Sequence, residues 1–163
     1  MAKDKELIPT PPRALNALGN LLKDILDGLI TVELFAGRGV ISKRFLKAGA
    51  QTAVCIDNNP PEEHEAADGM VWLEMDALQF LDEERVQNVG LIYSAPPPGS
   101  DYNRQILEKL PELNMLADNC LVILEEPTWS QTPLQNYPRY SVVETYEFGT
   151  TRIVVTQMVE LPV

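Results

Sequence analysis

The sequence predicts an α/β fold: a seven-stranded, mostly parallel sheet with helices on both faces and a C-terminal β-hairpin. Five short apolar runs with strand character alternate with segments whose apolar residues recur at helical spacing. This alternation implies right-handed crossovers and a parallel sheet covered on both faces. Two further strand-like runs flank the tripeptide GTT at 149–151, which is typical of a hairpin and makes the last strand antiparallel to the others.

Glycine and proline delimit the elements in chain order. Pro12 opens the first helix and Gly28 follows its end, Gly49 closes the second helix, and Pro96 ends the fourth strand because proline lacks a backbone N–H. Helices are predicted within 11–28, 40–50, 76–86 and 101–116, and strands within 30–37, 52–57, 70–75, 89–94, 119–126, 140–148 and 152–160. The stretch 58–69 holds at most a short helix.

Length and composition indicate a single globular domain over 1–163, with 1–28 as an N-terminal helical segment that leads into the core. No apolar run approaches the ~18 residues of a membrane span, so we expect a cytoplasmic protein without a membrane partner. Cys55 and Cys120 lie in apolar runs and are interpreted as reduced core residues, with one disulfide as the alternative. A single histidine, His64, predicts no metal site.

The formal charge of −11 argues against a general nucleic-acid binder, because neutralising phosphates requires a basic face. Composition therefore favours a small-molecule or protein partner, and a local basic patch stays open. The basic run of Lys43, Arg44 and Lys47 is interpreted as the exposed face of a helix.

The turn after the first strand predicts a cofactor site. Gly37 and Gly39 let the backbone approach a ligand between a strand end and a helix N-terminus. A nicotinamide-binding turn usually has a third glycine where this chain has Ser42. Glu33 would repel a pyrophosphate but suits the cationic groups of S-adenosylmethionine. The alternative is a tight turn with a solvated Glu33.

Two aspartates extend this predicted site. Asp57 ends the second strand roughly 20 residues beyond the glycines, where an acid can accept hydrogen bonds from both ribose hydroxyls. Asp76 follows the third strand and could receive the adenine amino group, or it could simply be the N-cap of the next helix. Phe35, within the turn, and Ala77, directly after Asp76, complete the predicted cofactor-binding set.

Together these motifs resemble the RsmD-like family of bacterial methyltransferases, which modify the guanine-N2 amine of small-subunit ribosomal RNA. The resemblance rests on PTPPRALNALGNLL (9–22), VELFAGRG (32–39), CIDNNP (55–60), LVILEE (121–126) and FGTTRIVV (148–155), in which Pro9, Thr10, Arg13, Gly149, Thr151 and Arg152 stand at matching places. It implies a Rossmann-like, S-adenosylmethionine-dependent fold, direct methyl transfer and a role in ribosomal RNA processing.

The chain departs from the family pattern at its catalytic motif. The family's acid–Pro–Pro–aromatic sequence falls on Ala95, Pro96, Pro97 and Pro98, so the acceptor pocket keeps a rigid proline frame without the acceptor and the ring. Asp57 and Asp76 are only 19 positions apart, which predicts that the helix between them is shortened or lost. Arg38 replaces a small hydroxyl residue and is expected to pair with Glu33 or with the cofactor carboxylate. The family's basic N-terminal extension is missing as well.

Tyr93 and Tyr102 flank this motif, Glu125 and Glu126 end the fifth strand, and Trp129 follows that strand. Tyr93 is interpreted as a core residue and Tyr102 as an ordinary residue of a surface helix. Trp129 is either a surface residue or a ring on which a base could stack. Glu125 and Glu126 are interpreted as a solvated rim.

The leading hypothesis is an S-adenosylmethionine-dependent methyltransferase related to the ribosomal RNA enzymes, with RNA or a ribosomal particle as partner. The alternative from another class is a catalytically silent protein of this fold that acts as a binding or regulatory module. A nicotinamide oxidoreductase comes third, because Glu33, Ser42 and the hairpin all disfavour it.

Overall fold

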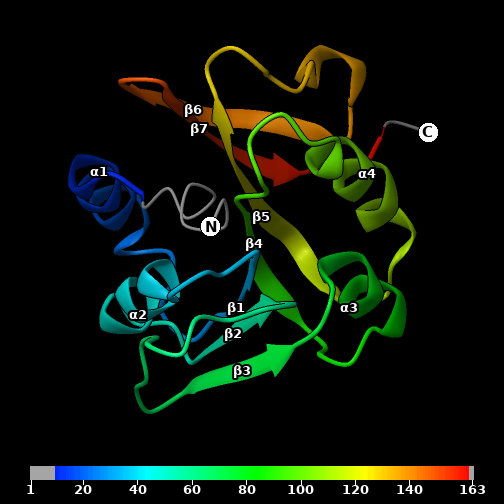
Figure 1. Cartoon of the computed structure of the whole chain (residues 1–163). Coiled ribbons are helices and arrows are strands. Elements are labelled where there is room, and N and C mark those ends of the chain that lie inside the picture. The colour runs from blue at the N-terminus through cyan, green and yellow to red at the C-terminus, as the bar shows by residue number, and fades with distance from the viewer. Residues whose placement is uncertain (1–9, 162–163) are drawn as a thin grey trace.

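The structure is a computed structural model that describes residues 10–161. Seven strands form one sheet in the order β3-β2-β1-β4-β5-β7-β6 (Figure 1). The strands are β1 (Ile30–Leu34), β2 (Thr52–Asp57), β3 (Met70–Glu74), β4 (Val89–Ser94), β5 (Leu116–Pro127), β6 (Tyr140–Phe148) and β7 (Thr151–Met158). The helices are α1 (Pro12–Leu22), α2 (Val40–Lys47), α3 (Ala77–Glu83) and α4 (Tyr102–Lys109), with short 3-10 turns η2 (Leu110–Glu112) and η3 (Leu134–Asn136).

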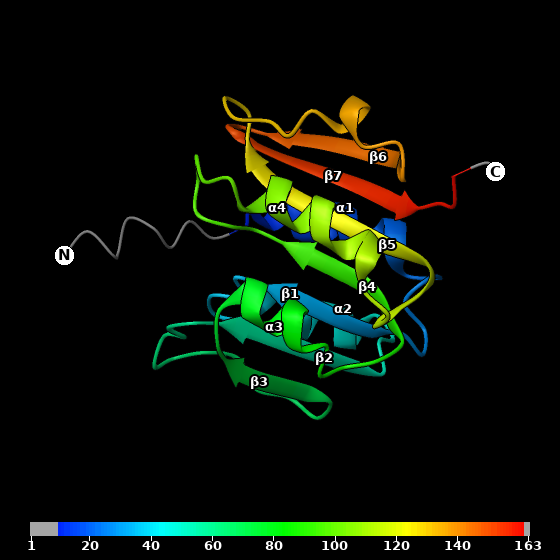
Figure 2. The same ribbon diagram turned by 90° about the vertical axis from the view of Figure 1, so that its right-hand side faces the viewer.

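Strands β1 to β5 are parallel, and β7 pairs antiparallel with both β5 and β6. The predicted seven-stranded, mostly parallel sheet and the C-terminal hairpin are therefore confirmed. The register places Leu34 opposite both Ile56 and Ser94, and Ser94 opposite Leu124. The carboxyl ends of these strands consequently meet at one edge of the sheet, on the left in Figure 2.

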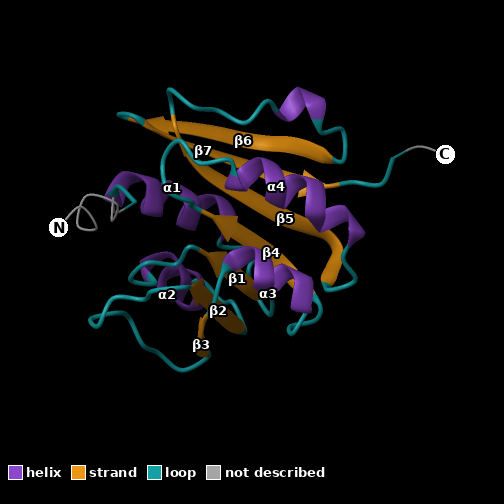
Figure 3. Cartoon of the chain, turned by 45° about the vertical axis from the view of Figure 1, so that its right-hand side comes forward, coloured by secondary structure: helices purple, strands orange, loops and turns teal. Residues whose placement is uncertain are grey.

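Two apolar cores lie on opposite faces of the sheet. Leu18 of α1 and Phe45 of α2 belong to one cluster with Tyr93, whereas Phe80 of α3 belongs to the other with Ile92. Neighbouring residues of β4 join different cores because side chains alternate along a strand. Helices α3 and α4 lie in front of the sheet in Figure 2 and α1 and α2 behind it, and Figure 3 gives an intermediate view.

The end of α1 and the start of β5 differ from the predicted boundaries. Helix α1 ends at Leu22 rather than near 28, because the chain continues in tight turns that bury Leu26. Strand β5 begins at Leu116, earlier than predicted. No helix forms in 58–69, in agreement with the prediction that this stretch holds at most a short helix.

The cysteine interpretation is confirmed, because Cys55 and Cys120 are both buried and free. No helix within residues 10–161 is long and apolar enough to cross a membrane. Over the same part of the chain, no group of three or more histidine, cysteine or acidic side chains could hold a metal ion. The predicted helical segment 1–28 is described only from residue 10 onward.

Candidate functional site

The turn between β1 and α2 holds a sharply bent backbone. Phe35, Gly37 and Gly39 all have positive φ, at 58°, 56° and 80°. For a phenylalanine this left-handed conformation is strained, and such strain gathers at ligand sites. A side chain at Gly39 would also meet Met70 and Trp72 at 2.7 Å, so glycine is required there for packing. The fold therefore requires this turn conformation and a glycine at position 39.

Asp57 fastens this turn to the end of β2. The Gly37 N–H donates to Asp57 Oδ2 (2.8 Å), and the Asn59 N–H donates to Asp57 Oδ1 (2.9 Å). An ionised carboxylate offers about four lone-pair sites, and these two contacts leave one on each oxygen. Asp57 is half-buried. It can therefore accept two further hydrogen bonds from a ligand lying over the turn.

Glu33 lies beneath the turn, where it anchors the start of α2. The side chain is only 4% exposed, and Glu33 Oε1 accepts from both the Ser42 N–H (3.1 Å) and the Ser42 hydroxyl (2.7 Å). Burial raises the Glu33 pKa to about 8, although the two Ser42 bonds pull it down. The alternative of a solvated Glu33 is wrong, because β1 and α2 enclose it. Its contact with a cofactor stays a prediction.

Asp76 is the N-cap of α3, which is one of the two roles that the sequence predicts for it. Its Oδ2 accepts from the backbone N–H groups of Leu78 (3.0 Å) and Gln79 (3.1 Å). Ala77, the first residue of the helix, is buried in the core that contains Phe80 and Ile92. Asp76 stands at the same edge of the sheet as Asp57, so receiving the adenine amino group stays a prediction compatible with capping.

Of the two expected partners of Arg38, the structure excludes Glu33, and the cofactor carboxylate stays a prediction. The Arg38 side chain is 59% exposed and pairs with Glu63 at 3.8 Å, away from the buried Glu33. Segment 58–69 folds back onto α2, since the Glu65 N–H donates to the Arg38 carbonyl (2.8 Å) and Lys43 Nζ contacts Glu65 Oε1 (2.8 Å). Segment 58–69 thus covers one end of the helix without a helix of its own.

The triple-proline segment borders a small pocket. This pocket has a volume of about 220 Å³ and lies between the loop after β4 and the loop after β5. Its lining includes Pro96, Pro97, Gly99, Asn103, Glu126 and Thr132. Ala95 is half-buried against the α1–α2 core, and Pro98 is exposed. As the sequence indicates, neither of these two residues brings an acceptor or an aromatic ring.

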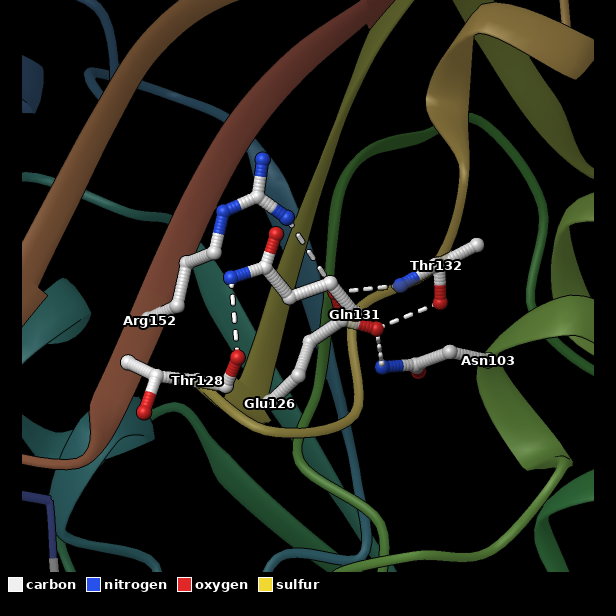
Figure 4. A network of polar contacts seen from close by, with 6 residues as sticks. All are labelled: Asn103, Glu126, Thr128, Gln131, Thr132 and Arg152. Atoms are coloured by element: carbon white, nitrogen blue, oxygen red, sulfur yellow. Dashed lines mark hydrogen bonds and ion pairs between the residues drawn. The ribbon is translucent and has the colours of Figure 1, made fainter.

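Glu126 holds the pocket wall together through a buried network (Figure 4). Its Oε2 accepts from the Asn103 amide (3.2 Å) and from the Thr132 hydroxyl, and its Oε1 accepts from the Thr132 N–H (2.9 Å) and lies 3.4 Å from Arg152 Nη1. Ser94 extends the network by donating to Asn103 Oδ1 (2.7 Å). The interpretation of Glu126 as a solvated rim is wrong, because it is 6% exposed and both oxygens are occupied.

Glu125 faces the opposite side of β5 and is also more enclosed than a rim residue. Its Oε1 accepts from the hydroxyls of Tyr93 (2.5 Å) and Thr10 (2.8 Å), and burial raises the Glu125 pKa. Tyr93 is a core residue, as predicted, and its own pKa is raised well above the usual value, chiefly by burial. Thr10 thereby fixes the segment before α1 beside the end of β5.

Two aromatic residues contact the loops at the carboxyl ends of the strands. Tyr102 packs on Phe35, with ring centroids 4.9 Å apart, so it links α4 to the strained turn. This contact corrects the interpretation of Tyr102 as an ordinary surface residue. Trp129 is 68% exposed and lies against Gly99 at the border of the pocket.

The structure brings the predicted residues to one edge of the sheet in two groups. Gly37 touches Asp57 directly, and the proline segment forms the separate pocket after β4. Asn103 and Thr132 were missed by sequence reasoning, because a lone amide and a lone hydroxyl in loops give no motif. Arg152 was marked only by the family resemblance.

One family model matches nearly the whole chain. The model of the family described as "Conserved hypothetical protein 95" matches residues 1–157. The chain belongs to this family. No curated protein sequence matches it.

Solved structures share the fold at low sequence identity. A protein from Escherichia coli, "Putative methyltransferase yhhF", superposes with a TM-score of 0.74 at 19% identity, covering 93% of this chain and 88% of that one. "Putative methylase HI0767" from Haemophilus influenzae gives 0.71 at 19%, covering 93% and 100%. SMU.776, "a putative methyltransferase complexed with SAH", gives 0.70 at 14%, covering 88% of this chain and 49% of its own. The chain thus shares its fold with proteins that are described as methyltransferases or methylases.

Proposed function

We propose that this protein is an S-adenosylmethionine-dependent methyltransferase whose acceptor is a nitrogen of a nucleobase in ribosomal RNA. The contact between Asp57 and the Gly37 N–H carries the proposal, because it sets an acid with spare acceptor sites against a glycine turn. Support also comes from the family, from the fold shared with proteins described as methyltransferases, and from one of those being complexed with SAH.

The residues present fit such a cofactor. Asp57 would hold the two ribose hydroxyls through its remaining lone pairs, and the bent backbone at 35–39 would lie close to the ligand. Glu33 would favour a cationic group above the turn through its ionised form, and Asp76 would receive the adenine amine through its second oxygen. The cofactor supplies an electrophilic methyl group on a sulfonium sulfur.

The acceptor would enter the pocket beside the proline segment. Pro96 and Pro97 line it and stiffen the chain after β4, so the backbone carbonyls there are held in place. Ala95 has no side-chain acceptor for the amine proton, so we expect weak activity toward a guanine amine. With a formal charge of −11, a ribosomal particle is a better partner than free RNA, because neighbouring ribosomal proteins can provide the missing contacts.

Calorimetric titration with S-adenosylmethionine, S-adenosylhomocysteine and NAD tests the cofactor. We expect both adenosyl compounds to bind and NAD not to bind. Asp57→Ala should weaken binding, whereas Asp118→Ala, an exposed acid near the start of β5, should not. Binding of NAD alone, or equal affinity in both variants, would contradict the proposal.

Tritiated methyl transfer to small-subunit particles then tests the acceptor. Wild type should be slow, and the double variant Ala95→Asp, Pro98→Tyr should be faster, because groups that act mainly in the transition state raise turnover more than affinity. Fast amine methylation by the wild type would refute the degenerate-site interpretation. Cofactor binding without turnover in either protein would instead favour the catalytically silent alternative.

A further inference from the structure

Trp129 is an exposed aromatic ring on an ordered turn. Its exposed fraction of 68% is the largest among the exposed large hydrophobic side chains of residues 10–161. The Ser130 N–H donates to the Pro127 carbonyl (3.1 Å), and the Gln131 amide donates to the Thr128 carbonyl (3.0 Å). The Thr128 N–H donates to the Thr150 carbonyl at the tip of the β6–β7 hairpin (2.8 Å), which connects the turn to this hairpin. A large exposed ring such as Trp129, on a turn held by hydrogen bonds, indicates a contact surface.

The ring is placed against the pocket by a glycine. A methyl group at Gly99 would lie 3.2 Å from Trp129 Cη2 and 3.5 Å from Cζ3, so the edge of the six-membered ring rests on this residue. Gly99 has a φ of 80°, which side chains rarely adopt, and it lines the pocket next to Pro97. The loop after β4 therefore leaves room for the Trp129 ring at the pocket border.

The buried network fixes the distance between these two loops. Asn103 at the start of α4 and Thr132 beyond the turn both donate hydrogen bonds to Glu126 at the end of β5 (Figure 4). The turn that carries Trp129 lies between Glu126 and Thr132, so both of its ends are held. Because the ends of the turn are held before binding, less conformational entropy is lost when a partner stacks on the ring.

The charge and the volume of the pocket indicate which kind of partner it can bind. Asp101, Glu125 and Glu126 line the pocket with Arg104, which pairs with Asp101 at 3.6 Å, so an anion is disfavoured. The volume of about 220 Å³ is below the ~300–1,000 Å³ of drug-sized sites and suits one ring system. The Asp101 carboxylate and the second lone pair of the Asn103 amide oxygen, which accepts one bond from Ser94, suit the N–H groups of a neutral heteroaromatic ring.

We propose that Trp129 stacks on the acceptor nucleobase at the pocket border and supplies the ring face that Pro98 lacks. Trp129 is a positioning residue: it orients the planar ring while the pocket receives the amine edge. The inference rests on the proposed function, because the acceptor pocket is that of the methyltransferase site.

Tryptophan fluorescence tests this directly, because the chain has two tryptophans. In a Trp72→Phe protein, all tryptophan emission comes from Trp129. Titration with guanosine should quench it saturably, and titration with ribose should not. A Trp129→Leu protein, which keeps only Trp72, should show no saturable quenching. Absence of saturable quenching up to the solubility of guanosine, or equal quenching by ribose, would overturn the proposal.

Affinity measurements separate stacking from a structural role. By calorimetry, Trp129→Leu should bind guanosine roughly 10-fold more weakly, and Trp129→Phe should stay within about 3-fold of wild type, because it keeps a ring. Gly99→Ala should also weaken binding, since it displaces the ring. S-adenosylmethionine affinity should not change in either Trp129 variant. Guanosine affinity unchanged in Trp129→Leu would refute the inference, whereas lost cofactor binding in the wild type would refute the proposed function.

Discussion

Replacing Glu33 by glutamine should make the stability of the protein less dependent on pH. Glutamine has nearly the same shape and can still accept both Ser42 hydrogen bonds, but it does not ionise. In the wild type, burial raises the Glu33 pKa from 4.5 to about 8. The folded state therefore keeps a proton that the unfolded state loses above about pH 4.5.

The sign and size follow from proton linkage. Because the folded state binds more protons between about pH 4.5 and about pH 8, the free energy of unfolding of the wild type falls as pH rises through this window. One pKa unit corresponds to about 1.4 kcal/mol, so the loss attributable to Glu33 has an upper limit of about 5 kcal/mol. Glu125 also has a raised pKa and acts in the same direction, but it is present in both proteins and cancels in the difference.

Urea unfolding at several pH values between about 5 and about 8.5 measures this difference. The stability of Glu33→Gln minus that of the wild type should grow steadily toward high pH. Ser42→Ala is the matched control, because it removes one hydrogen bond to the carboxylate without removing the titrating group. Parallel stability curves for wild type and Glu33→Gln would show that Glu33 titrates normally and that its burial has no energetic consequence.

Four other outcomes are expected. Gly39→Ala should lower the free energy of unfolding by ~1–3 kcal/mol in urea titrations, since a methyl group meets Met70 and Trp72 at 2.7 Å. Asp57→Ala should weaken S-adenosylmethionine binding by ~1–3 kcal/mol in calorimetry. Calorimetry near neutral pH in buffers of different ionisation enthalpy should detect proton release as the cationic cofactor lowers the Glu33 pKa. Filter binding to bare RNA should be weak and fall steeply with salt, and salt-resistant binding would contradict the charge argument.

Local patterns were enough to predict the mostly parallel seven-stranded sheet, the hairpin and the lack of a full helix in 58–69, because side-chain periodicity and spacing record them. The surroundings of the acids were not predictable in this way. Glu126 was interpreted as a solvated rim residue, yet it is enclosed by Asn103 and Arg152, which are distant in sequence. Glu33 was assigned to the cofactor site, and its enclosure by Ser42 of α2 was not predicted. Such burial depends on how helices pack across the sheet, and no single segment encodes it.

The insertion of β7 between β5 and β6 has a consequence for how the protein is made. Residues 116–127 leave the ribosome before residues 151–158, so the growing chain presents β5 with one unpaired edge. Arg152 reaches Glu126 only when the last strand slots into place, which makes the pocket wall one of the final parts to form during synthesis. A nascent chain in which β7 has not yet been made therefore lacks the contact of Arg152 with Glu126 in the pocket wall.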